Sequence, residues 1–66
     1  MKPARERLRE AISADWEMAS AIAKRAEVNP KAAGQMLAKI HRDSLGGRGR
    51  IIDRRRNYAG FWEYRR

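Results

Sequence analysis

The sequence contains no cysteine, so no disulfide can stabilise the fold, and neither a thiolate zinc site nor a cysteine nucleophile can form. Its single histidine, His41, has no companion ligand for a metal ion and no evident nucleophile to activate. No pair of carboxylates stands in an apolar setting that would shift its pKa values for acid–base chemistry. We therefore expect no enzymatic activity, no metal site and no cofactor, and the lack of cysteine favours a reducing compartment.

Long apolar runs are also missing. The longest is far short of the roughly 18 residues that span a bilayer, and the opening "MKPARERLRE" lacks the apolar region of a signal peptide. We therefore expect a cytoplasmic protein that does not enter a membrane. A chain of 66 residues is long enough for one domain, 1–66, and chains of this size bury only about 60% of the surface that the unfolded chain exposes. Marginal stability or a macromolecular partner is expected, without room for a small-molecule pocket.

Positive charge is what the sequence has in excess. Sixteen Lys and Arg residues stand against eight Asp and Glu residues, for a net charge of +8. The segment 48–66 alone holds seven basic and two acidic residues. Such an excess attracts polyanions, of which nucleic acid is the first candidate, before an anionic membrane or an acidic protein.

Apolar periodicity predicts three helices, at about 3–13, 17–27 and 30–43. The third has the clearest start signal, because Asn29 can cap free N–H groups and Pro30 tolerates the first helical position. It ends near "LGG", where Gly46 or Gly47 can adopt the left-handed conformation. On a helical wheel its apolar residues gather on one side, while Lys31, Gln35 and Arg42 fall near the opposite pole.

After the third helix the pattern changes to that of strands. The runs "RIIDRR" and "FWEYRR", separated by "RNYAG", predict a β-hairpin at about 50–65. Trp62 and Tyr64 share one face of the second strand and are expected to face the core. Trp16 is also expected in the core, because so small a domain needs its aromatic side chains for burial. The fold class is thus α+β, mainly helical, with three helices and a C-terminal hairpin.

Three helices followed by a basic hairpin resemble the winged helix-turn-helix superfamily of DNA-binding proteins. The resemblance is sharpest over "IAKRAEVNPKAAGQML". Ala23 matches the small residue that helix-turn-helix proteins have in the middle of the second helix, where the recognition helix crosses close by. Glu27 stands where many members have glycine. The apolar positions that hold the turn of such proteins are matched by Ala26, Val28, Ala33 and Met36.

The resemblance implies a set of DNA-contacting residues. Lys31, Gly34 and Gln35 would meet base edges, and Lys39 and Arg42 would lie nearer to phosphates. Arginines at the hairpin tip would reach the flanking backbone or the minor groove. The hairpin and the glycine-rich linker before it would contribute Arg48, Arg50, Arg54, Arg55, Arg56 and Asn57.

The function implied is sequence-specific binding of double-stranded DNA by a small transcriptional regulator of bacterial, phage or mobile-element type, acting as a homodimer or a cooperative oligomer. Two alternatives stay open: an RNA- or protein-binding module on the same scaffold, and an accessory architectural factor in recombination. An ordinary solvated helix face would also explain Lys31, Gln35 and Arg42.

Overall fold

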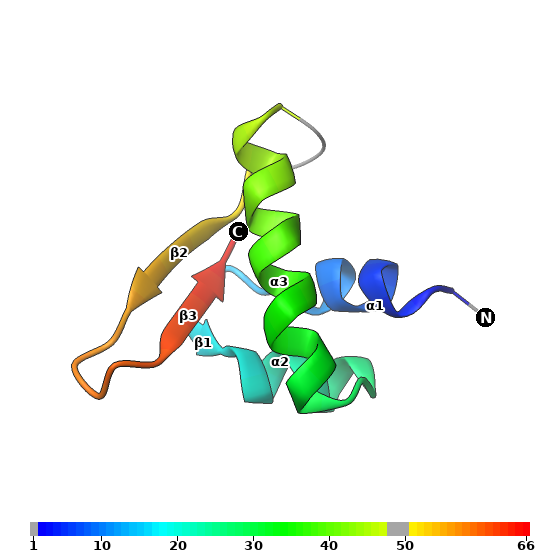
Figure 1. Ribbon diagram of the computed structural model, residues 1–66, viewed down its shortest axis with the longest axis horizontal. Helices are drawn as coiled ribbons and strands as arrows, with labels where there is room; N and C mark the ends of the chain where they lie inside the picture. Colours follow the sequence, from blue (N-terminus) through cyan, green and yellow to red (C-terminus); the bar gives the residue numbers. More distant parts are fainter. Residues whose placement is uncertain (1, 48–50) are drawn as a thin grey trace.

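The computed structural model describes residues 2–47 and 51–66. Figure 1 shows the order of its elements, which confirms the expected α+β, mainly helical fold with a C-terminal hairpin. The hairpin lies on one side of the third helix and the first helix lies on the other. The elements are α1 (Ala4–Ala11), β1 (Glu17–Met18), α2 (Ala19–Ala26), α3 (Pro30–Leu45), β2 (Asp53–Arg56) and β3 (Trp62–Arg65).

The ends of α3 follow the signals in the sequence. The side chain of Asn29 accepts a hydrogen bond of 2.9 Å from the N–H of Lys31, and Pro30 is the first helical residue. At the other end Gly47 has φ +85°, the left-handed conformation that glycine adopts without steric cost. The helix runs through Leu45, two residues beyond its expected end at about residue 43.

The strand β1 was not predicted. We expected the second helix to begin at about residue 17, but Glu17 and Met18 pair with Tyr64 and Glu63 of β3, and α2 begins at Ala19. The sheet is antiparallel with the order β1-β3-β2. A strand of two residues leaves no local periodicity, and its partner lies near the other end of the chain.

The core lies between the three helices, and one side of the sheet closes it. The hairpin region contributes Ile52 and Tyr64 to the core, and each is 2% exposed. Of the two adjacent isoleucines, Ile51 is the one that faces solvent. The buried apolar side chains of the helices and of the joint after α1 are Leu8, Ile12, Ile22, Ala23, Ala26, Ala33, Leu37 and Ile40.

The expectation for the tryptophans was wrong. Trp62 is 38% exposed, and Trp16 is half-buried but outside the core cluster. The tip of the hairpin projects away from the helices (Figure 1). On the same face of β3, Tyr64 is 2% exposed and belongs to the core, whereas Trp62 does not. Trp62, closer to the hairpin tip, has no helix to cover it fully.

The turn between α2 and α3 contains a left-handed residue that is not glycine. Glu27 has φ 58° and ψ 47°, and its N–H donates to the carbonyl of Lys24 at 3.2 Å. Val28 then donates to the carbonyl of Ala23 at 2.9 Å. For an L-residue this conformation costs about 1–2 kcal/mol. The chain accepts this strain at the junction that joins the two helices.

Candidate nucleic-acid interface

The exposed side of α3 carries a polar and basic stripe. Lys31, Gln35, Lys39 and Arg42 are all exposed, while Ala33, Leu37 and Ile40 on the other side are buried. Within 2–47 and 51–66, none of the three basic residues of the stripe takes part in an ion pair. The stripe is thus free to meet a polyanion.

Gly34 lies in the middle of α3, beside this stripe, on the flank toward the hairpin. A methyl group added at its Cα would meet no atom within 4 Å. Glycine inside a helix costs about 1 kcal/mol relative to alanine. No close contact within the described residues therefore requires a glycine at this position.

We expected the arginines of the hairpin at its tip, but they lie in the strand β2. The tip consists of Tyr58, Ala59 and Gly60, and Gly60 has φ +88°. The side-chain oxygen of Asn57 accepts hydrogen bonds of 3.0 Å from the N–H groups of both Ala59 and Phe61. Asn57 therefore holds the turn, and the alternation of β2 divides the arginines between two faces.

The inner face of the hairpin is the face that carries Arg54, Arg56, Trp62 and Tyr64. Arg54 pairs with Tyr64 across the strands, and Arg56 pairs with Trp62. The guanidinium groups of Arg54 and Arg56 lie 4.0 and 4.8 Å from the centroid of the Trp62 ring. Neither arginine takes part in an ion pair within the part of the chain that is described. The inner face thus presents two positive charges that no acidic side chain neutralises.

The outer face carries Asp53, Arg55, Glu63 and Arg65, and its charges balance. Arg55 donates to Glu63 at 2.7 Å, and Arg65 lies 3.5 Å from a carboxylate oxygen of Asp53, too far for a good hydrogen bond. Both guanidinium groups lie over Trp16, 4.4 and 4.6 Å from its ring centroid. A hollow of about 650 Å³ opens beside the hairpin tip and is lined by Arg55 and Glu63 of this face and also by Arg56. The four charged residues of the outer face themselves carry no net charge.

A second hollow, the cleft, separates α3 from the inner face. Its volume is about 330 Å³, and it is lined by residues of α2, α3 and the sheet. Pro30 and Gly34 form its wall on α3, and Trp62 and Tyr64 form its wall on β3. The other lining residues are Met18, Ala19, Ser20 and Phe61.

His41 marks how close the hairpin comes to α3. Partial burial lowers the pKa of His41 below its ordinary value, the positive charge of Arg54 lowers it further, and Asp53 acts in the opposite direction. The lowered pKa favours the uncharged imidazole, and Arg54 carries the positive charge at this junction. Among the described residues, no group of three His, Asp or Glu side chains is placed to hold a metal ion.

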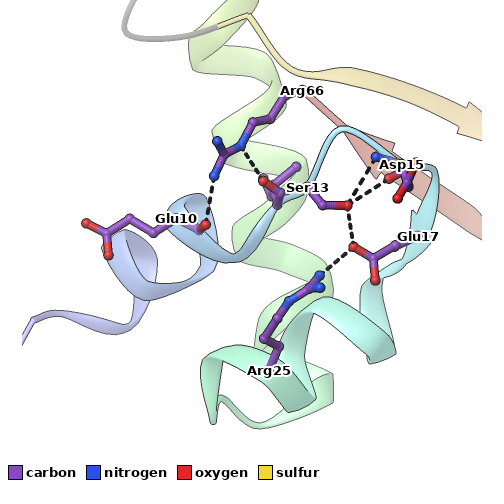
Figure 2. A network of polar contacts seen from close by, with 7 residues as sticks. Glu10, Ser13, Asp15, Glu17, Arg25 and Arg66 are labelled. Carbon is purple, nitrogen blue, oxygen red and sulfur yellow. Dashed lines mark hydrogen bonds and ion pairs between the residues drawn. The ribbon is translucent and has the colours of Figure 1, made fainter.

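A polar network fixes the sheet to the helices (Figure 2). Arg66, after β3, donates from its backbone to the carbonyl of Ser13 at 2.9 Å and from its guanidinium to the carbonyl of Glu10 at 3.0 Å. The hydroxyl of Ser13 donates to Glu17 at 2.6 Å, and Arg25 of α2 bonds the same carboxylate. These two donors lower the pKa of Glu17. The network sets the position of the hairpin relative to α2, and nothing local in the sequence indicated it.

Arg48 and Arg50 lie outside the described residues. Sequence reasoning did not predict that Trp62 lies under Arg54 and Arg56. It also did not predict that Glu17 accepts hydrogen bonds from Ser13 and Arg25. The stacking of Arg54 and Arg56 on Trp62 follows from the strand register, which the sequence alone does not supply. Within the described residues, no helix combines the length and apolarity needed to cross a membrane.

Comparisons with protein-family models, with curated proteins and with solved structures found no match.

Proposed function

We propose that this chain is a winged helix-turn-helix protein that binds double-stranded DNA sequence-specifically. In this proposal α3 occupies the major groove, and the inner face of the hairpin lies on the adjoining backbone and minor groove. The observation that carries it is the division of charge on the hairpin: the basic face is the one that looks toward α3, across the cleft. The face that looks away is neutral.

The dimensions and side chains of α3 suit base reading. An α-helix with its side chains is about 10–12 Å wide, which fits the major groove of about 12 Å. Lys31 can donate to guanine O6 and N7, and Gln35 can form a bonded pair with adenine N6 and N7. Lys39 and Arg42, farther along the same stripe, would contact phosphates.

The stacked arginines suit the phosphate backbone. A guanidinium over an indole ring is attracted by the face of the ring and keeps its N–H donors available to phosphate oxygens. Arg54 and Arg56 are held in this way before DNA arrives, so less side-chain entropy is lost on binding. Arg55, although expected among the contacts, bonds Glu63 on the outer face, and the side chain of Asn57 is engaged in the turn. The proposal leaves both out of the DNA contacts.

The biological role proposed is that of a small cytoplasmic transcriptional regulator of bacterial, phage or mobile-element type. One reading helix makes few base contacts, so a homodimer or cooperative binding at adjacent sites would supply the missing affinity. An RNA- or protein-binding module and an architectural factor in recombination are the alternatives.

Selection of bound sequences from random duplex DNA tests the proposal. Enrichment of one motif is expected, and a motif with two related halves would indicate a dimer. Retention of DNA without any enriched motif would favour an architectural factor. Failure to retain duplex DNA at low salt would contradict the proposal and favour the RNA- or protein-binding module.

A further inference from the structure

The strand β2 forms one edge of the sheet. The strand order β1-β3-β2 gives β2 a single neighbour, and Figure 1 shows β2 as the outermost strand on its side. Within residues 2–47 and 51–66, the backbone of Asp53–Arg56 forms hydrogen bonds with β3 alone. One side of β2 therefore carries backbone N–H and carbonyl groups that no other described segment pairs. Such a free edge is the feature by which a sheet accepts a further strand.

The register shows which backbone groups point toward the free edge. The N–H of Asn57 donates to the carbonyl of Phe61 at 2.9 Å, so these residues form a hydrogen-bonded pair at the end of the ladder. Such pairs alternate with non-bonded ones along antiparallel strands, so Arg55 is the next residue of β2 to bond β3. Arg54 and Arg56 occupy the non-bonded positions, and their N–H and carbonyl groups point away from β3.

The side chains of these two arginines define the chemistry of a strand that fits the edge. Arg54 and Arg56 lie on the inner face, and neither takes part in an ion pair among the described residues. In an antiparallel sheet, residues that exchange backbone hydrogen bonds also have their side chains on the same face. An added strand that bonds both arginines thus places two of its own side chains, two positions apart, beside two guanidinium groups. Acidic side chains complement them.

A second copy of this chain is a poor occupant of the edge. In a two-fold pairing centred on Arg55, Arg54 of one copy would lie opposite Arg56 of the other. A pairing centred on Arg54 or on Arg56 would place two copies of that arginine opposite each other. Like charges directly opposite each other destabilise a sheet. Charge therefore favours an acidic segment of another protein.

We propose that the free edge of β2 binds an acidic segment of a partner protein as an additional strand, and that this strand and DNA exclude each other. The segment is extended, with acidic side chains at alternate positions, and the backbone groups at those positions bond β2. The exclusion rests on the proposed function, in which Arg54 and Arg56 contact phosphates. Because the strand occupies the same two guanidinium groups, the partner protein would release this chain from DNA.

Two isomeric peptides test the added strand. The probe is a short, fluorescently labelled peptide in which glutamate alternates with threonine, and the full chain is titrated into it while anisotropy is recorded. One isomer is N-methylated at two glutamates and the other at two threonines, so charge and mass are equal. Methylated glutamates cannot donate to β2, and affinity should fall by roughly ten- to a hundredfold. Methylated threonines face away from β2, so affinity should stay within about threefold of the unmodified peptide.

A pair of variants tests the same contact from the side of the protein. Arg56→Ala and Arg56→Pro remove the same guanidinium, but only proline also removes the outward N–H. Proline is tolerated in an edge strand where its nitrogen faces outward, and circular dichroism checks that both variants fold. The peptide should bind Arg56→Pro about three- to tenfold more weakly than Arg56→Ala. Equal affinities would contradict the assignment of the Arg56 N–H to the added strand.

Competition with DNA tests the exclusion. The unmodified peptide should displace the chain from a labelled duplex at concentrations near its own Kd, and the isomer with methylated glutamates should require at least about ten times more. Equal affinity of the two isomers for the chain, or no binding of the unmodified peptide, overturns the added strand. A peptide that binds while the duplex stays bound overturns the exclusion. If no duplex DNA is bound at all, the proposed function fails, and the peptide titrations alone decide whether β2 accepts a strand.

Discussion

The guanidinium of Arg54 lies 4.0 Å from the centre of the Trp62 ring, on the face of the hairpin that looks toward α3. Arg56 reaches the same ring from the next position on that face, at 4.8 Å. Arg55, between them in the sequence, points the other way and bonds Glu63. Strand alternation therefore turns a run of like charges into one basic face and one neutral face.

The two faces should respond differently to removal of charge. In Arg54→Gln/Arg56→Gln, the slope of log affinity against log salt should fall in magnitude by about 2, because each phosphate contact contributes about 0.9. The matched control is Arg55→Gln/Arg65→Gln, which removes the same charge from the outer face. It should leave the slope nearly unchanged. An equal effect of both double variants would refute the assignment of DNA contacts to the inner face.

Trp62 should act by positioning the two arginines. Trp62→Leu removes the ring on which they stack and should weaken binding of any duplex by about tenfold, with a smaller effect on stability, because Trp62 is 38% exposed. Trp62→Phe retains an aromatic face and should restore most of the affinity. If leucine and phenylalanine prove equivalent in a binding titration, the stacking has no role in DNA binding.

The strained residue between α2 and α3 gives a prediction about stability. Glu27→Gly relieves a left-handed conformation that costs about 1–2 kcal/mol but adds freedom to the unfolded chain, so the free energy of unfolding should rise by about 0.5–1 kcal/mol. Glu27→Ala retains the strain and should give no such gain. Urea denaturation measures both variants, and a loss of stability in Glu27→Gly would show that the Glu27 side chain itself stabilises the turn.

Glu17 links stability to pH. The hydrogen bonds from Arg25 and Ser13 lower its pKa in the folded state below the ordinary value of 4.5. A lowered folded-state pKa stabilises the fold above pH 4.5, and this contribution is lost as the pH falls through the folded-state pKa. Glu17→Gln should therefore destabilise the domain by about 1 kcal/mol at pH 7 and have little effect near pH 3. Urea midpoints across this pH range, with the exposed Glu6→Gln as control, measure the difference.

Local signals in the sequence were sufficient for α3 and for the existence of the hairpin. Asn29 and Pro30 act within one turn of the helix that they start, and the wheel of α3 separates Lys31 and Gln35 from Leu37 without knowledge of other elements. The tip of the hairpin is set by Asn57 and Gly60, which also act locally.

Features that depend on pairing between distant segments could not be predicted. The strand β1 exists only because β3 lies beside it, and the separation of Arg54 from Arg55 requires the register of β2 against β3. The exposure of Trp62 depends on how far the hairpin projects beyond the helices. Each of these features was settled by tertiary structure, which outweighs local preference in so short a chain.

Whether α3 reads bases is tested most directly by the ratio of cognate to random DNA affinity in Gln35→Ala. The side chain is exposed, so the domain should remain folded. The account predicts a loss of about 1–3 kcal/mol on the selected motif and little change on random duplex, so the ratio falls by roughly ten- to a hundredfold. Arg42→Ala, on the same stripe, should weaken both duplexes alike and leave the ratio unchanged. An unaltered ratio in Gln35→Ala would contradict the account.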